Sequence, residues 1–212
     1  TVFASGTPTP TYQWQMSSDS GASWATLTAG ATLSLTENFD GVTAPALPAG
    51  WTTSTLAGTT NPWATRTTTP DSAPNAAFAS NLASVSDSVL VSPAVAVPAG
   101  LSQLTFRHQY DTELFWDGGV LEIAIGTGAF ADILTAGGSF VSGGYSATLY
   151  TGDDPLGGRP AWTGNSGAYV TTVVRLPAAA AGQTVVLRWR LGSDGSVSAT
   201  GWSVDSIVLS TS

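Results

Sequence analysis

Short apolar runs separated by Gly, Pro, Asn and Asp dominate the hydrophobic pattern of this chain. Alternating apolar and polar residues predict strands over 90–97, 101–110, 119–126, 168–176, 184–192 and 201–210. A weak helical pattern occurs in AFASNLAS, near residue 80, and LPAAAAGQ (176–183) allows one helical turn. Many short strands joined by loops of mixed length predict an all-β protein, specifically a two-sheet antiparallel β-sandwich of jelly-roll type.

Residues 1–36 differ from the rest of the chain. Their pattern predicts a strand over 12–16, a turn at SSDSG, a short strand around Trp24 and a further strand over 31–36. So few strands bury little apolar area and are marginal alone. We therefore predict two units, a short N-terminal β segment over 1–36 and a β-sandwich domain over 37–212.

The alternation also assigns the faces of the strands. His108 shares the apolar face of its strand, so we expect a hydrogen-bonded core residue and no catalyst. Glu37 and Asp205 also fall on apolar faces, where an unpaired ionised carboxylate is costly. Two such acids, near the start and the end of the main unit, predict a shared Ca²⁺, which takes six to eight oxygen ligands. The alternatives are that each acid pairs with an arginine, or that a bulge shifts the alternation.

A second group of acids lies in the stretch FRHQYDTELFWDGGVLEI (106–123). The pattern predicts two strands joined by a turn, with Asp111, Glu113 and Asp117 gathered at the connection. We expect these acids to order the loop, with Asp111 and Asp117 as ligands of a second Ca²⁺.

Composition narrows the functional classes. The net charge is −8, the pI is about 4.2, and only 9% of residues are charged, with no lysine. This balance excludes nucleic acid and anionic membranes as partners, because both need a basic surface. The absence of cysteine excludes disulfides and thiolate chemistry, and no apolar run is long enough for membrane insertion. The Ser-, Thr- and Gly-rich chain shows no signal peptide, so we expect a mature or trimmed extracellular bacterial protein.

Seven motifs, taken in order, resemble one type of module. They are ENFDG (37–41), LPAGW (47–51), DSVLVSP (87–93), LTFRHQYDTE (104–113), DGGVLEI (117–123), AAGQTVVLRWRLGSD (180–194) and GWSVDSI (201–207). This order is similar to the MAM-like or cleaved-adhesin-like jelly roll, also called a choice-of-anchor domain, of secreted bacterial proteins. The resemblance implies a non-catalytic β-sandwich with structural calcium. Its first-strand acid matches Glu37, with Asn38 and Asp40 nearby, and its last-strand acid matches Asp205. Many relatives carry a further acid where this chain has Ser206.

Residues 1–36 resemble the middle of a bacterial Ig-like domain. Trp14 matches the third-strand tryptophan of that family, and the S-x-D-x-G-x-x-W hairpin matches SSDSGASW (17–24). The first and closing strands of the family pattern are missing, and half a sandwich exposes strand edges. We therefore expect residues 1–36 to associate with another protein chain or with a second copy of this one.

The candidate chemistry favours binding over catalysis. The chain has no G-x-S-x-G motif, and its one histidine is expected in the core, so we predict that it is not an enzyme. The leading interpretation is a non-catalytic, calcium-stabilised module for adhesion or for cell-surface or fibre assembly. The alternative is a carbohydrate-binding module of a secreted hydrolase, with Trp63, Trp116 and Trp162 stacking on glycans. A competing interpretation of these three tryptophans is that they anchor loops.

Overall fold

The computed structural model describes residues 15–16, 25–26 and 33–211, and the chain divides into two compact units, Thr1–Ala31 and Thr32–Ser212. In the first unit, β1 (Gln15–Met16) pairs antiparallel with β2 (Ala25–Thr26). The rest of the expected Ig-like segment, including Trp14 and Trp24, lies outside the described residues.

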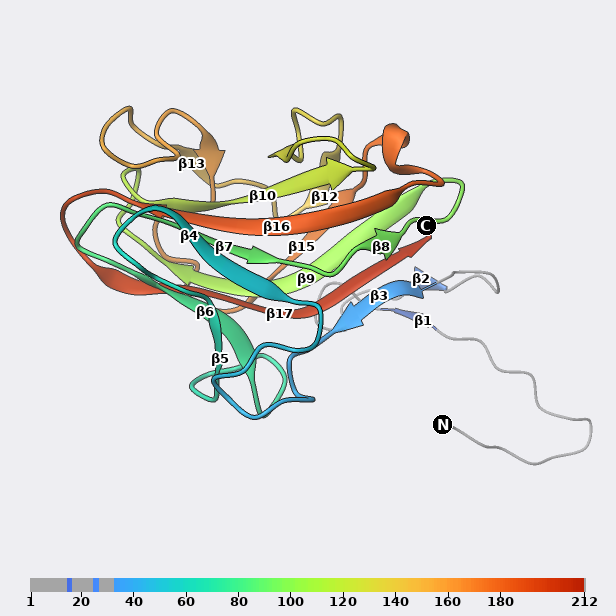
Figure 1. Cartoon of the computed structure of the whole chain (residues 1–212), viewed down its shortest axis with the longest axis horizontal. Helices are drawn as coiled ribbons and strands as arrows, with labels where there is room; N and C mark the ends of the chain where they lie inside the picture. Colours follow the sequence, from blue (N-terminus) through green and yellow to red (C-terminus); the bar gives the residue numbers. More distant parts are fainter. Residues whose placement is uncertain (1–14, 17–24, 27–32, 212) are drawn as a thin grey trace, which may run out of the picture. The chain divides into compact units, whose positions relative to one another are not determined.

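The second unit is built from two antiparallel sheets (Figure 1). The first contains, in spatial order, β11 (Ala131–Asp132), β10 (Gly118–Ile125), β16 (Thr184–Ser193), β7 (Ser86–Val91) and β4 (Thr52–Gly58), with β8 (Val95–Ala96) also paired to β16. The second contains β12 (Ser139–Ser142), β15 (Val170–Arg175), β9 (Ser102–Asp111), β17 (Ala199–Thr211), β6 (Ala76–Asn81) and β5 (Ala64–Arg66), with β3 (Leu33–Glu37) also paired to β17. A small separate pair joins β13 (Ala147–Thr148) and β14 (Pro160–Ala161). The predicted two-sheet antiparallel β-sandwich is confirmed.

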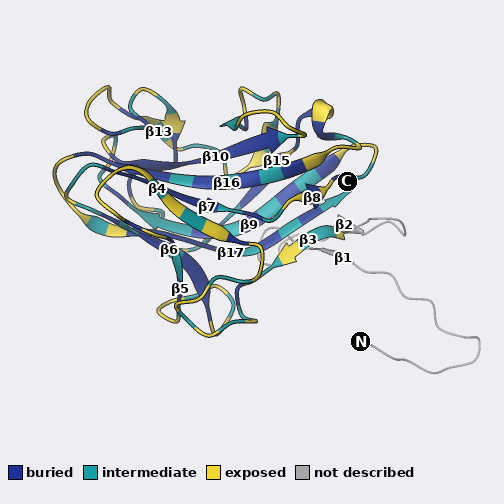
Figure 2. Cartoon of the chain, viewed as in Figure 1, coloured by how far each residue is buried: buried dark blue, intermediate teal, exposed yellow. Residues whose placement is uncertain are grey.

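The long strands alternate between the two sheets along the chain. β6, β9, β15 and β17 belong to the seven-stranded sheet, while β7, β10 and β16 belong to the other. The two sheets pack face to face, which gives β9 its alternating burial, whereas β7 and β10 are buried on both faces. Buried residues run along the long strands of both sheets (Figure 2). Aromatic rings fill this core: Phe106 meets Trp162 and Trp189 edge to face, with ring centroids 5.8 and 5.6 Å apart.

Local sequence predicted most of these elements correctly. Five of the six long strands lie within a few residues of their expected positions, and the predicted helical turn is the 3₁₀ helix η1 (Ala178–Ala180). The single strand predicted over 90–97 is wrong, because the chain there forms the end of β7, a break at 92–94 and the short β8. The weakly helical stretch near residue 80 is instead strand β6, because Ala77 and Ala79 are buried on one face while Phe78 points to the other. Since η1 has only three residues, no helix of the described part is long enough to cross a bilayer.

Strand β17 carries the largest departure from the expected alternation. Its register against β9 shifts between Asp205 and Val208, and Ser206 adopts φ +50°. Asp205 therefore pairs with Arg107, on the sheet face opposite the core, and does not share the face of Ile207 as expected. The strand expected over 31–36 is found as β3, and it pairs with β17 in this sheet.

His108 occupies the core position that its strand pattern predicts. The side chain is fully buried, and its Nδ1 accepts a hydrogen bond from Trp202 Nε1 at 3.1 Å. The Nε2–H then donates to Thr172 Oγ1 at 2.8 Å, and this hydroxyl donates to the carbonyl oxygen of Gly143. Burial, together with the charge of Arg107, lowers the pKa of His108 to about 3, so the imidazole is neutral and structural.

Candidate cation site

The loop between β9 and β10 brings two acids together by its own geometry. The backbone amides of Trp116 and Asp117 both donate to the carbonyl oxygen of Glu113, at 3.2 and 3.0 Å, which closes one tight turn. Phe115 within this turn adopts φ +69°, and the hydroxyl of Thr112 donates to the Asp117 carbonyl. The turn therefore fixes the spacing of the Glu113 and Asp117 carboxylates.

A third acid reaches the same place from the neighbouring strand. Gly118, at the start of β10, pairs with Gly192 of β16, so Asp194 just beyond β16 lies beside Asp117. One carboxylate oxygen from each of Glu113, Asp117 and Asp194 lies within 4.8 Å of the other two. This is the single group of three possible metal-ligating side chains in the described part of the chain, and we call it the acidic site.

The acids of this site are only partly satisfied by hydrogen bonds. Asp117 is fully buried and accepts from Asn81 Nδ2 at 2.6 Å and from the backbone amide of Asp194 at 2.7 Å. Glu113 Oε2 is buried and has no hydrogen-bond partner. Burial raises the pKa of Asp117 to about 6, the two hydrogen bonds oppose this shift, and the charges of Asp194 and Glu113 reinforce it.

A fourth acid, Asp154, lies close to this group. It is 5% exposed, its Oδ1 accepts from the Leu156 amide, and its buried Oδ2 has no partner. Its Oδ1 sits directly over Gly192, where an added Cβ would lie 2.2 Å away. Burial raises the pKa of Asp154 to about 7, and the charges of neighbouring acids, including Asp117 and Asp194, add to this shift.

No basic side chain in the described residues neutralises the acidic site. Arg107 pairs with Asp71, while three arginines pair with acids elsewhere on the six-stranded sheet, chiefly with the buried Glu122. None of these ion pairs includes Glu113, Asp117, Asp154 or Asp194. Buried negative charge without a counterion is costly, and it is the condition that a bound cation relieves.

The first cation site expected from sequence has a different environment. Asp205 is fully buried, but its carboxylate accepts from the backbone amides of Asp71, Ser72 and Ser206 at 2.6–2.9 Å. The Ser72 hydroxyl lies 3.2 Å from Asp205 Oδ1 and 3.1 Å from Asp40 Oδ2, so it bridges these two acids. Backbone amides thus stabilise the buried Asp205 carboxylate, which is the role that a bound cation was expected to fill.

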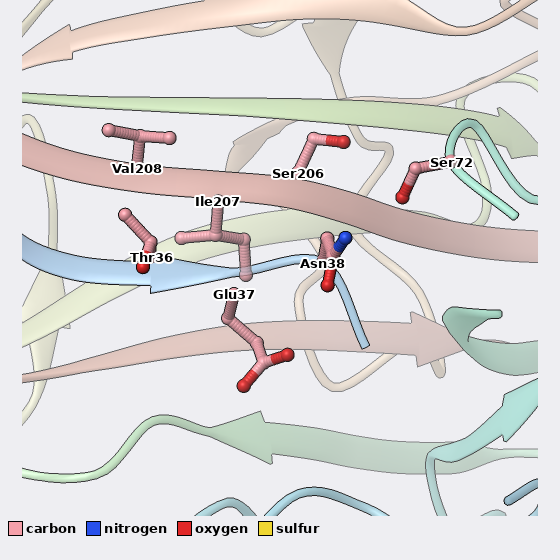
Figure 3. Close-up of a pocket in the computed structure, with 7 residues that line it drawn as sticks. All are labelled: Thr36, Glu37, Asn38, Ser72, Ser206, Ile207 and Val208. Carbon is pink, nitrogen blue, oxygen red and sulfur yellow. The ribbon is translucent and has the colours of Figure 1, made fainter. Parts of the chain in front are cut away.

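Glu37 and Asn38 line a shallow cavity of about 390 Å³ beside β3 and β17 (Figure 3). The Glu37 carboxylate accepts from the Phe39 amide at 2.7 Å and points away from Ser72 and Ser206. Asn38 donates to Asp40 Oδ2 at 2.7 Å. The structure joins Asp40 to Asp205 and Asn38 to Asp40, while Glu37 belongs to no group of three potential ligands. Calcium at these four residues stays a prediction.

Asp111 lies away from the acidic site. Its Oδ1 accepts from Asn165 Nδ2 at 2.9 Å, and its Oδ2 accepts from the Thr200 hydroxyl at 2.7 Å. Asp111 thus ties the loop around Asn165 to the start of β17, at the end of the seven-stranded sheet. Of the expected second pair of ligands, Asp117 has acidic neighbours suited to a cation, while Asp111 is absent from the group.

The three candidate tryptophans have different environments. Trp63 and Trp162 are each 1% exposed and belong to the core, so neither ring offers a face to a glycan. Their sequence contexts are loop-like, yet both rings pack on Trp202, with ring centroids 5.4 and 5.6 Å away. Trp116 is 39% exposed and packs at 5.1 Å from the ring of Tyr150, which is 50% exposed. Trp116 is therefore the one of the three that can meet a ligand.

Asp194 and Asp154 are the site residues that sequence reasoning missed. Asp194 stands in GSDG, directly after a long predicted strand, which is a turn signal with an acid in it. Its closeness to Asp117 depends on the pairing of β10 with β16, which no local pattern reveals. Asp154 lies in an irregular loop, and we find no sequence signal that would single it out.

Comparison with known proteins identifies the fold. No protein-family model and no curated protein matches the sequence. The K3 cleaved adhesin domain of Lys-gingipain from Porphyromonas gingivalis has a TM-score of 0.51 at 18% identity, covering 86% of this chain and all of that domain. The K2 cleaved adhesin domain of Lys-gingipain has a TM-score of 0.50 at 17% identity, covering 87% and 99%. At such identities the likeness shows the fold alone: this chain is an antiparallel β-sandwich, similar in fold to these two domains.

Proposed function

We propose that this chain is a non-catalytic extracellular module of a bacterial protein, used for adhesion or surface assembly and stabilised by calcium at the acidic site. The observation that carries the calcium assignment is the group formed by Glu113, Asp117 and Asp194 within 4.8 Å, with no basic partner. The unpartnered buried oxygens of Glu113 and Asp154 support it, because native proteins rarely leave such atoms unsatisfied.

The donor set fits a hard cation. Every candidate ligand is a carboxylate oxygen, and calcium binds oxygen ligands at about 2.3–2.6 Å in flexible geometry. Zinc favours nitrogen and sulfur ligands, which the acidic site lacks. When bound, the cation offsets the charge of buried acids and ties the β9–β10 loop to the end of β16.

The proposal that the module is non-catalytic rests on the environment of His108. This imidazole is neutral, fully buried and hydrogen-bonded at both nitrogens, so it reaches no substrate. Two structures with this fold are described as adhesin domains, and adhesion is the corresponding role we propose here. The lysine-free, weakly charged composition supports an extracellular location.

Isothermal titration of the whole chain, first stripped with a chelator, tests the calcium assignment. We expect calcium to bind in the micromolar range or tighter and to raise the melting temperature, while magnesium at equal concentration has a much smaller effect. Absence of calcium binding at millimolar concentration would refute the assignment.

Assembly through residues 1–36 remains a proposal, because most of these residues lie outside the described part. Light scattering of the whole chain and of a chain beginning at Thr32, which keeps β3 in the sandwich, each with calcium and with chelator, tests it. We expect the whole chain to self-associate or to bind a partner chain, and the shorter chain to be a monomer. Monomers in all four samples would argue against self-association.

A second candidate function is carbohydrate binding, which the exposed pair of Trp116 and Tyr150 favours. Phe115 adds a third ring, 5.4 Å from Tyr150, and the Tyr150 amide donates to the Phe115 carbonyl at 2.7 Å. Exposed aromatic rings held at fixed positions are suited to stack on sugar rings. A glycan array with the native chain and Trp116→Ala tests this candidate, which requires a hit that the variant loses.

A further inference from the structure

A polar pocket lies at the end of the seven-stranded sheet. It shares no residue with the acidic site or with the exposed rings of Trp116 and Tyr150. Its volume is about 230 Å³, and its walls come from β5, β9, the start of β17 and the loops around Thr69 and Asn165. Its lining includes both hydrogen-bond donors and acceptors, from Arg66, Gln109, Asp111, Asn165 and Thr200. Trp116 is not among the lining residues.

Arg66 is the unusual wall of this pocket. Its guanidinium lies 3.4 Å from the centroid of the Phe78 ring and donates to the Ser203 hydroxyl at 2.8 Å. It takes part in none of the ion pairs of the described residues, and its buried Nε has no hydrogen-bond partner. The stacking fixes the plane of the guanidinium, and Arg66 lines the pocket with no ion-pair partner among the described residues.

Asp111 contributes hydrogen-bond acceptors to the lining of the pocket, in contrast to the donors of Arg66. Its carboxylate is oriented by Asn165 Nδ2 and by the Thr200 hydroxyl, at 2.9 and 2.7 Å, and an isolated bridge pairs the Asp111 and Asn165 backbones. A carboxylate oxygen has capacity for more than one hydrogen bond, so Asp111 retains acceptor sites for a ligand hydroxyl. Gln109 is bound only weakly, by a 3.4 Å contact from its Nε2 to the Gly167 carbonyl, and its amide is free to turn toward a ligand.

These features select one class of ligand. A hydroxyl group both donates and accepts, so a polyol satisfies an arginine and a carboxylate in the same pocket. The carboxylate of Asp111 would repel a free anion. An apolar ligand would leave the polar side chains that line the pocket without hydrogen-bond partners. We propose that this pocket binds a sugar ring of a neutral glycan, with Asp111 accepting from its hydroxyls and with Arg66 and Gln109 donating to them. The inference rests on the proposed role as a binding module and supplies its ligand class.

The test is titration of the whole calcium-loaded chain with β-1,4-linked tetrasaccharides of glucose, xylose, mannose and galactose, and with tetragalacturonate. We expect at least one neutral tetrasaccharide to bind with a dissociation constant below about 1 mM. Gln109→Ala and Asp111→Asn should each weaken that binding about tenfold, the usual effect of losing one hydrogen bond to a ligand. Thermal melting shows whether each variant is folded.

Two further variants distinguish this pocket from other parts of the surface. Gln103→Ala changes the same residue type on the same strand and face, outside the pocket, and should leave affinity unchanged. Trp116→Ala tests the aromatic loop as the alternative site, and loss of glycan binding in this variant would assign the glycan to that loop and overturn the proposal. Tighter binding of tetragalacturonate, no neutral binding, or full affinity in Gln109→Ala and Asp111→Asn would each overturn the proposal. Calcium titration tests the acidic site independently. Failure of the calcium proposal can therefore be distinguished from failure of the glycan proposal.

Discussion

Asp194→Asn should change the stability of the domain in opposite directions with and without calcium. Two carboxylates 4.8 Å apart repel by about 3 kcal/mol at an effective dielectric constant of about 20. Partial protonation and relaxation reduce this cost, so we expect removal of the Asp194 charge to stabilise the calcium-free domain by about 2 kcal/mol. Asparagine keeps the Oδ1 that accepts from the Ser196 amide and hydroxyl, so the local turn survives.

With calcium the order should reverse. A ligand at 100 times its dissociation constant stabilises the native state by about 2.7 kcal/mol, and each kcal/mol raises the melting temperature of a domain this size by about 2–4 °C. The native chain should therefore gain about 5–11 °C from calcium, while Asp194→Asn gains little because one of three carboxylates is lost.

Differential scanning calorimetry of both proteins, with calcium and with chelator, measures this reversal. Asp153→Asn is the matched control, because Asp153 is an exposed acid outside the acidic site, and its calcium response should equal that of the native chain. A lower melting temperature for Asp194→Asn in chelator, or an undiminished calcium response, would refute the reasoning.

Three further predictions concern the scaffold. Glu122→Gln should lower the free energy of unfolding at pH 7 by about 3 kcal/mol in urea titrations, because three buried or half-buried arginines lose their shared carboxylate. Burial opposes ionisation of Glu122, but the arginines prevail and lower its pKa, so the deficit of the variant should shrink as the pH falls through that lowered value. The proton signals of His108 should stay constant from pH 8 to 5 in NMR spectra, and a titration midpoint near 6.5 would contradict its buried, neutral state. Gly119→Ala should destabilise the fold by about 1–3 kcal/mol, because its Cβ would lie 2.3 Å from the Trp202 ring, whereas Gly195→Ala has open space and should have little effect.

Sequence patterns predicted the parts of the molecule that depend on local periodicity. The inward placement of His108 follows from alternation within a single strand, and the structure confirms it. For Asp205 the face predicted from alternation is wrong. The bulge at Ser206 reverses the alternation, and the outward Asp205 then accepts from the backbone amides of residues 71–72, in a distant part of the chain. Such contacts between distant segments leave no local periodic signal.

The candidate site was predictable only in part for the same reason. Glu113 and Asp117 stand close together in the sequence of the β9–β10 loop, so their grouping was predictable. Asp194 joins them through the pairing of β10 with β16, about 70 residues apart along the chain. The burial of Trp63 and Trp162 likewise depends on tertiary packing, since both stand in loop-like sequence contexts.

The position of β17 constrains when the sandwich can form during synthesis. β17 is the last strand in sequence, yet it lies between β9 and β6 and also pairs with β3. A nascent chain that ends before Ala199 therefore has two segments of one sheet with no strand between them. The domain cannot fold stepwise as it emerges from the ribosome, and its sheet must close in one late event. Such a delay leaves this sheet without its central pairing until residues 199–211 have been synthesised.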